Sequence, residues 1–190
     1  TQKYGADTFM YYSIGASAPC LDLNYNFDDV EIKRRNLNIL WNLHNFVMDL
    51  SHAIGKNPAE LKITELGDEE RFIFSKLNSK IKKVTQLMDK YKLNEVPWEI
   101  EELYMELSRT YIQLVREKTN SGTDEEKEMV LYTAYNVIMK IIVLIAPITP
   151  MITEMMYLNF KSEFKLPKES VHLMDYPTFD EIMIDEKLEH

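Results

Sequence analysis

The sequence has few of the residues that build cross-linked or turn-rich folds. Its 190 residues include one cysteine, Cys20, with five glycines and seven prolines. A single cysteine excludes an internal disulfide framework and cannot supply a structural zinc site, and it fits a reducing compartment. The shortage of glycine and proline argues against a β-sandwich with many turns and favours long helices.

The chain also lacks the apolar segments that direct a protein to a membrane. Residues 1–10 have neither the basic start nor the apolar run of a signal peptide. The most apolar stretch, residues 137–148, contains Lys140 and is shorter than the roughly 20 residues that a membrane span requires. We therefore predict a cytoplasmic protein with no membrane partner, in which this stretch forms a buried helix.

Catalytic and metal-binding motifs are missing as well. The sequence has no glycine-rich phosphate loop, no G-x-S-x-G and no H-E-x-x-H. Glu169 and His172 form a single Glu-x-x-His pair, whereas a di-iron bundle needs two such pairs on long helices. We therefore expect no catalytic residue, no metal site and no cofactor in this chain.

What the sequence does have is apolar periodicity. Apolar residues make up 45% of the chain and recur at helical spacing along most of it, which predicts an all-α helical bundle. The expected helices cover residues 4–14, 28–54, 68–91, 100–115, 124–145 and 149–160. Short strands are expected at 23–26 and 170–174, and an irregular tail follows residue 161.

Side chains at the helix starts predict the boundaries. Asp28 and Glu31 have the spacing of a capping box, and Asp68 is expected to cap the next long helix. Pro147 follows an apolar helix, and Thr149 with Pro150 has the pattern of a new helix start. Two helices should therefore meet at a corner defined by proline.

The net charge of −9 is unevenly distributed. Residues 71–92 contain seven basic residues and one acidic residue, a local charge of +6, and residues 33–35 form a second basic cluster. Acidic residues concentrate in 95–106, in 124–128 and in the tail. Such blocks are typical of solvated helix faces, but a basic face is also what a nucleic-acid partner requires.

The helix predicted for residues 28–54 has two contrasting faces. Projected at about 100° per residue, its expected core face and its polar face lie opposite each other. The core face consists of Ile39, Leu43, Phe46 and Leu50, and the polar face of Arg34, Asn38, Asn42, Asn45, Asp49 and His52. Trp41 lies on the flank of the polar face. A cation can bind a phosphate, an amide can bond to a base edge, and an indole can stack on an unstacked base, so this face suits RNA. Alternatively, Trp41 packs on a neighbouring helix and the amides are merely solvated.

A series of sequence strings resembles one protein family. RRNLNILWNLHNF (residues 34–46) is similar to a family helix "LNxLWNxxRF", DEERFIFSKLNS (68–79) to "D+WILSRLNS", and LSRTYI (107–112) to "LSRWYI". YGAD (4–7), APCLDLNYNFDDVE (18–31), LIAPITPMITEMMY (144–157) and ESVHLMDYP (169–177) complete the series in family order. The strings resemble the anticodon-binding region of class I aminoacyl-tRNA synthetases of the isoleucyl, valyl, leucyl and methionyl branch. LNILWN (37–42) with SVHLMDYP (170–177) is most similar to isoleucyl-tRNA synthetases.

The resemblance implies a domain plan and a function. It implies a stem-contact segment in residues 1–27, a helical anticodon-binding domain in 28–165 and a C-terminal extension in 166–187; residues 188–190 resemble a tag remnant. The implied partners are a tRNA, through its anticodon stem-loop, and the rest of the parent ligase in cis. The parent would ligate isoleucine to its tRNA with ATP and Mg²⁺, but this chain lacks the family's "HIGH" and "KMSKS" motifs and its editing domain, so it should be inactive alone.

The resemblance also assigns roles to individual residues. The candidates for the anticodon side are Arg34, Asn38, Trp41, Asn42 and Asn45. Weaker candidates, as phosphate contacts or structural residues, are Lys80, Lys83, Arg109 and Arg116; for Arg109 a partly buried salt bridge between helices is an equal alternative. Glu154, Tyr157 and His172 are expected to serve packing and capping.

The sequence departs from the family at two positions, and other interpretations stay open. Met10 and Asn45 stand where the family often has arginine, which puts a phosphate or stem contact in doubt. The alternatives are the same domain of a valyl or leucyl enzyme, a helical scaffold that binds a protein partner through an exposed methionine and aromatic patch, and a standalone bundle enzyme.

Overall fold

Helices account for all the regular secondary structure of residues 3–189, the part of the chain that this computed structural model describes. The all-α prediction is confirmed. The α-helices are α1 (Ala6–Ala16), α2 (Phe27–Ile54), α3 (Asp68–Asp89), α4 (Val96–Glu106), α5 (Ile112–Leu114), α6 (Arg116–Ser121), α7 (Asp124–Ile145) and α8 (Pro150–Phe164). A π-helix, η1 (Leu107–Tyr111), continues α4 into α5, and the tail contains the 3₁₀ turns η2 (Val171–Leu173) and η3 (Glu181–Met183).

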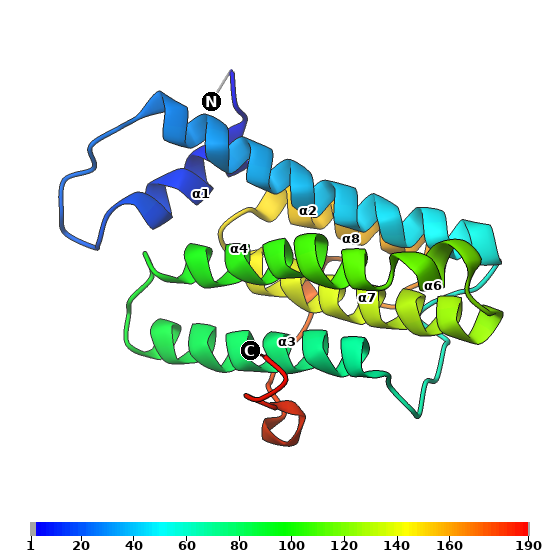
Figure 1. Ribbon diagram of the computed structural model, residues 1–190. Helices are drawn as coiled ribbons and strands as arrows, with labels where there is room; N and C mark the ends of the chain where they lie inside the picture. Colours follow the sequence, from blue (N-terminus) through cyan, green and yellow to red (C-terminus); the bar gives the residue numbers. More distant parts are fainter. Residues whose placement is uncertain (1–2, 190) are drawn as a thin grey trace.

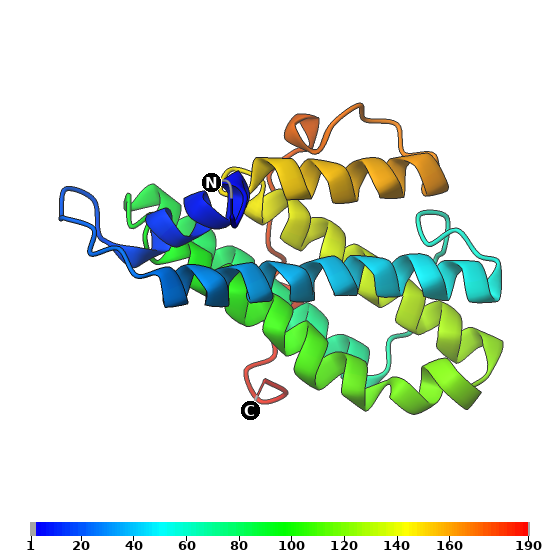
Figure 2. The same ribbon diagram turned by 90° about the horizontal axis from the view of Figure 1, so that it is seen from above.

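The helices form a bundle around α7. Figure 1 shows α2 on one side and α3 on the other, with α4 and α7 between them. Figure 2, seen from above, shows α8 beside α2 and α1 near the start of α2. By length and composition α7 could cross a bilayer, but 67% of its most apolar window is buried inside the bundle. It is therefore the buried core helix that was predicted for the apolar stretch.

A buried polar cluster fixes α1 against α2 and α4. The hydroxyl of Tyr11 donates to Oε2 of Glu101 at 2.5 Å and lies 3.0 Å from the hydroxyl of Tyr104. Nζ of Lys33 donates to the same Glu101 oxygen at 2.8 Å. Burial, together with the nearby Glu101 charge, raises the pKa of both tyrosines, so they stay neutral donors. Lys33 is therefore half-buried and already paired, so it does not supply a free cation to a basic surface cluster.

A second cluster holds the start of α3 against η1 and α6. Glu70 is fully buried, and its Oε1 accepts from the hydroxyl of Tyr111 at 3.3 Å. Lys118 of α6 donates to both carboxylate oxygens of Glu70 at 3.2 Å and to Glu69 at 3.0 Å. These contacts supply the partners that a buried carboxylate requires.

Several predicted boundaries need correction. Residues 23–26 and 170–174 contain no strand: the first lies in an irregular connection, and the second forms η2. Neither segment has a neighbouring extended chain with which to pair, because helices occupy the interior. The first helix runs through Gly15 to Ala16 instead of ending at Gly15.

The predicted caps are wrong in detail. Asn26, not Asp28, caps α2, because its side chain accepts from the backbone N–H of Asp28. Asp68 is the first residue of α3 and makes no capping bond. Thr123 with Glu126 forms a capping box on α7 that was not predicted.

The proline corner lies where it was predicted, but its cap comes from elsewhere. Thr149 precedes α8, yet its hydroxyl donates back to the carbonyl of Ile145 at 3.4 Å. The carboxylate of Asp7 in α1 instead accepts from the backbone N–H groups of Met151 at 3.2 Å and Ile152 at 2.6 Å. An acidic side chain at a helix N-terminus accepts from the unpaired backbone N–H groups and interacts favourably with the helix dipole. Asp7 therefore ties the start of α8 to α1.

The acidic tail lies along the outer face of α3, as Figure 1 shows at the end marked C. Asn78 accepts from the backbone N–H of Asp180 at 2.7 Å, and Lys82 pairs with Glu181 at 3.0 Å. Ser75 and Ser79 both donate to Oε1 of Glu189. Of the predicted tag remnant, His190 lies outside the described residues.

Candidate nucleic-acid interface

The outward side of α2 carries the polar residues that its spacing predicts. We call the row formed by Arg34, Asn38, Trp41, Asn42 and Asn45 the α2 edge. Because they recur at helical intervals, these side chains lie along one side of the helix. Arg34, Asn38 and Asn42 are exposed, whereas Trp41 and Asn45 are half-buried. The structure thus brings together all five predicted anticodon-side residues, but nothing in it tests their role.

The buried face of α2 differs from the predicted one by roughly 90° of helix rotation. Ile39 and Phe46 are only half-buried. The buried residues are Val30, Leu37, Leu40, Leu43, His44, Val47, Leu50 and Ser51. The rotation follows from packing on α7 and α8, which a projection of one helix does not contain. It brings the flank with Trp41 towards the core.

Trp41 rests on a stack of rings that reaches into the core. Its ring centroid lies 5.2 Å from that of His44, and His44 lies 4.6 Å from Phe160 of α8. His44 is 1% exposed and Phe160 is fully buried. Trp41 therefore packs against buried neighbours, as the alternative interpretation expects, while the rest of its indole remains accessible to a base. Base–aromatic stacking is worth about 1–3 kcal/mol per base.

The same histidine contacts Asn45. Nδ1 of His44 lies 3.1 Å from Oδ1 of Asn45. Burial lowers the pKa of His44, and this effect outweighs the opposing effects of Asn45 and of the backbone of Met156. The imidazole is therefore neutral near pH 7.

The three basic residues at 33–35 have different surroundings. Lys33 is bound to Glu101, and Arg35 pairs with Glu31 one turn earlier at 2.7 Å. Arg34 is exposed, and among residues 3–189 no carboxylate lies within ion-pair distance of it. Arg34 is thus the cation of this cluster that is available to a phosphate.

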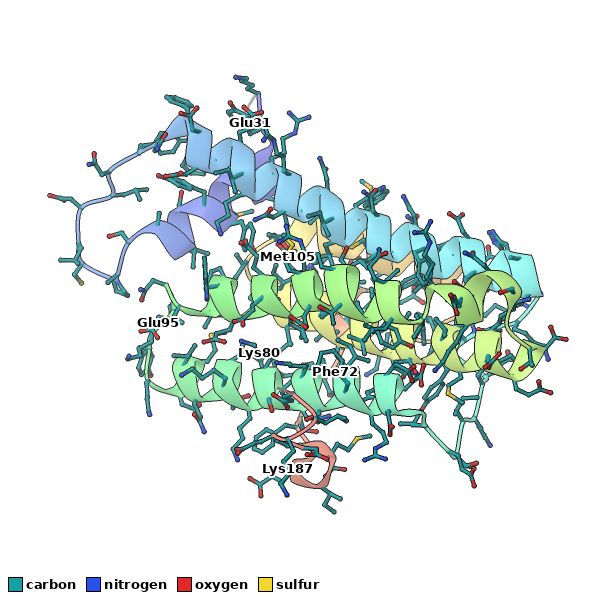
Figure 3. All side chains as sticks on the ribbon, in the orientation of Figure 1. Glu31, Phe72, Lys80, Glu95, Met105 and Lys187 are labelled. Carbon is teal, nitrogen blue, oxygen red and sulfur yellow. The ribbon has the colours of Figure 1, made fainter. Side chains whose placement is uncertain are left out.

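The two candidate lysines of α3 have different surroundings. Lys80 points towards α4, as Figure 3 shows, and pairs with Glu99 and Glu102 at 2.6 Å each. Burial lowers the pKa of Lys80, but its bonds to these carboxylates outweigh burial and raise it overall. These contacts favour the structural alternative for Lys80. Lys83 is exposed, on a helix separated from α2 by α4 and α7 (Figure 1).

Arg109 and Arg116 lie in the helical segments that follow α4, in η1 and α6 respectively. The salt-bridge alternative for Arg109 is wrong within the described residues: its side chain is exposed, and no carboxylate there reaches it. It projects from the π-helix η1, where Leu107 and Tyr111 both turn inward. Insertions of this kind are frequent at functional sites. Arg116 is exposed at the start of α6.

Two of the three residues expected to serve packing and capping do so. Oε2 of Glu154 accepts from the hydroxyl of Ser170 at 2.9 Å and from the backbone N–H of Val171 at 3.0 Å, so it caps η2. Tyr157 is buried and donates to the carbonyl of Lys168 at 3.0 Å. His172 is exposed instead. Among residues 3–189 no three potential ligand side chains are grouped as a metal site requires.

Two contacts in this region were not predicted: His44 supports the α2 edge, and Asp7 caps α8. His44 shares its spacing with Leu40 and Val47, and that three-to-four interval was a signal that it faces inward. The capping role of Asp7 had no such signal, because its partners lie more than 140 residues further along the chain.

Comparison with known proteins gives consistent matches. A sequence profile described as the anticodon-binding domain of tRNA ligase matches residues 70–190. Isoleucine–tRNA ligases are similar over nearly the whole chain: that of Methanopyrus kandleri is 35% identical over 99% of it, and that of Methanosarcina mazei 36% over 98%. The ligase of Pyrococcus horikoshii is 35% identical over 99% of the chain. The chain spans 18% of the length of each of these relatives.

A solved structure has the same fold. The LeuRS of the LeuRS–tRNA–LeuAMS ternary complex from Agrobacterium radiobacter K84 superposes with a TM-score of 0.69 at 19% identity. The match covers 97% of this chain and 21% of that one. At this identity the likeness concerns the fold alone.

Proposed function

Because the chain belongs to the family of anticodon-binding domains of tRNA ligases, we propose that it binds the anticodon stem-loop of a tRNA as part of an isoleucine–tRNA ligase. One observation carries the proposal: the α2 edge presents a half-buried indole, supported by buried rings, beside exposed amides and an unpaired guanidinium. Unstacked bases in single-stranded loops are recognised with this combination of groups.

Each part of the edge has a distinct task in this proposal. Arg34 contacts a backbone phosphate, and the Trp41 ring receives an unstacked base. The amides of Asn38, Asn42 and Asn45 hydrogen-bond to base edges. Lys83, Arg109 and Arg116 are further phosphate contacts, whereas Lys80 holds α3 against α4.

The chemistry of the ligase belongs to the parent protein. We propose that the parent activates isoleucine with ATP and Mg²⁺ in the cytoplasm and transfers it to tRNA. This chain, which has neither "HIGH" nor "KMSKS", would hold the tRNA so that its acceptor end reaches that distant site. It would not catalyse either step alone.

Fluorescence anisotropy tests the proposal. The chain is titrated against labelled transcripts of isoleucine, valine and leucine tRNAs at two salt concentrations. We expect tighter binding to the isoleucine tRNA, a preference that moves with a grafted anticodon, and weaker binding at the higher salt concentration. Equal binding to all three would refute anticodon reading and leave a stem-docking module. No binding by the folded chain would contradict the proposal for the isolated domain.

Apolar surfaces favour a second role, contact with the rest of the ligase in cis. Met151, Met155 and Leu158 form an exposed apolar stripe on α8, with Met155 55% exposed. Substitution of Met155 by glutamate separates the roles: it should lower aminoacylation by the full-length ligase while leaving the tRNA affinity of this chain unchanged. If it instead lowers that affinity, the stripe is part of the RNA surface; unchanged activity of the full-length ligase removes the cis role.

A further inference from the structure

His44 is nearly fully buried directly beneath the α2 edge. It is 1% exposed, yet it contacts two of the residues proposed to bind RNA. Its ring lies between Trp41 and Phe160, tilted 35° from the first and 39° from the second. Its Nδ1 lies 3.1 Å from Oδ1 of Asn45. One buried side chain thus links the aromatic and the amide parts of the edge.

His44 holds Asn45 whichever ring nitrogen carries the hydrogen. Nδ1 of the imidazole and the side-chain amide of Asn45 are joined by a 3.1 Å hydrogen bond, and the tautomer decides which of them donates. The backbone of Met156 in α8 also acts on the ring, because it raises the pKa of His44 against the effect of burial. The imidazole is therefore held from α8 as well as from α2.

This contact leaves the other end of the Asn45 amide available to RNA, because no other described group forms a hydrogen bond to it. The neighbouring Trp41 ring is packed against the same imidazole. An unstacked base and its hydrogen-bonding edge would therefore meet a preset pair of groups.

We propose that His44 is a positioning residue for RNA recognition: it holds the Trp41 ring in place and orients the amide of Asn45 towards the edge of the base. The inference rests on the proposed function and deepens it, because it names the buried residue that positions Trp41 and Asn45. His44 itself does not touch the RNA. Its effect on binding passes through Trp41 and Asn45.

A double-mutant cycle between His44→Phe and Asn45→Ala tests the amide part. Phenylalanine keeps an aromatic ring between Trp41 and Phe160 but removes the ring nitrogen that bonds to Asn45. The probe is an isoleucine tRNA transcript, with affinity measured by anisotropy. We expect each single variant to lose about threefold to tenfold in affinity, which is the usual effect of one hydrogen bond. The double variant should lose no more than Asn45→Ala alone, because the two residues act as one unit.

The ring part is tested in the free protein. Trp98→Phe leaves Trp41 as the only tryptophan of the two in the sequence. In that background we expect acrylamide to quench Trp41 fluorescence more strongly after His44→Leu but not after His44→Phe, and the side-chain amide signals of Asn45 to shift in both. Leu43→Ala is the matched control for lost stability, because Leu43 is buried one position away but lies about 100° further around α2 than His44.

The outcomes separate the inference from the proposed function. If the unsubstituted chain binds no tRNA, the function fails, and the quenching and amide signals still decide whether His44 positions its neighbours. If His44→Phe binds like wild type while Asn45→Ala does not, the orienting role is overturned. Equal losses in His44→Phe and Leu43→Ala, in proportion to their stability, would reduce His44 to a packing residue.

Discussion

The outer faces of α2 and α3 show that the charge of a segment does not predict where that charge is available. Residues 71–92 are the most basic stretch of the sequence, yet much of its charge is paired: Lys80 with Glu99 and Glu102, and Lys82 with Glu181 of the tail. The α2 edge has one unpaired guanidinium, Arg34, but it also has the amides and the supported indole that single-stranded RNA requires. We therefore propose that α2 recognises the RNA bases and that much of the charge of α3 stabilises the bundle.

The difference has a simple physical cause. A lysine held by a carboxylate has already exchanged its hydration for an ion pair, and a phosphate would have to displace that partner. Half-buried aromatic and amide groups keep their orientation without RNA, so less entropy is lost when it binds.

Removing the indole should weaken RNA binding most. We expect Trp41→Ala to lower the affinity for isoleucine tRNA by about 1–3 kcal/mol, because a base loses its stacking partner. Anisotropy titration measures this loss, and Trp98→Ala, which removes an indole that is 65% exposed, should have little effect. A large fall in melting temperature with unchanged affinity would make Trp41 a purely structural residue.

Removing the paired lysine of α3 should have the opposite consequence. Lys80→Met deletes two charge-assisted hydrogen bonds of 2.6 Å and leaves the mostly buried Glu99 unpaired. We expect a loss of about 1–2 kcal/mol in the free energy of unfolding, measured by urea denaturation, with unchanged tRNA affinity. Lys83→Met, at an exposed position on the same helix, should change stability by less than about 0.5 kcal/mol. Reduced affinity in Lys80→Met would make Lys80 itself a contact to RNA.

The buried histidine under the α2 edge should make stability depend on pH. The pKa of His44 is lowered from its ordinary 6.5, so below pH 6.5 the unfolded chain takes up a proton that the folded chain does not. Stability is therefore full above that pH and falls as the pH drops towards the lower folded value, by at most about 1.4 kcal/mol per pH unit. Urea denaturation from pH 7.5 to 5 measures it. His44→Phe should lack this component, and parallel curves for the two proteins would contradict the assignment.

Removing the unpaired guanidinium of Arg34 should chiefly change the salt dependence of tRNA binding. Arg34→Ala should reduce the slope of log affinity against log salt concentration by roughly 0.7–0.9, the value for one phosphate contact. Lys83→Ala serves as the matched α3 variant, and we expect it to change the slope less. Titrations at four salt concentrations measure both slopes. A larger change for Lys83 would reverse the contrast between the two helices.

Much of the fold could be predicted from the sequence, because local signals determine it. The helix at 124–145 begins and ends where its pattern predicts, and the corner at Pro147 follows from the geometry of proline. The failures come from contacts distant in sequence. Because α2 packs against other helices, its buried face differs from the one that its own sequence predicts. Asp7 of α1, not Thr149, caps α8. A single-helix projection contains neither contact.

The candidate site was predictable in its residue types but not in its pairings. Helical spacing placed Arg34, Asn38 and Asn42 on one exposed side. The partners of Lys33, Lys80 and Lys118 could not be read from the sequence, because each pairs with a residue at least 19 positions away on another helix. The roles of these residues in RNA binding stay predictions.

The indole N–H signals of the two tryptophans test whether the Trp41 side of α2 recognises the RNA. Trp41 lies on the α2 edge. Trp98 belongs to α4, and its ring lies beside Lys33, away from the α2 edge. On titration of ¹⁵N-labelled protein with the anticodon stem-loop of isoleucine tRNA, we predict that the Trp41 signal shifts in a saturable way while the Trp98 signal stays in place. Saturable binding that leaves Trp41 unchanged would contradict the assignment of recognition to α2.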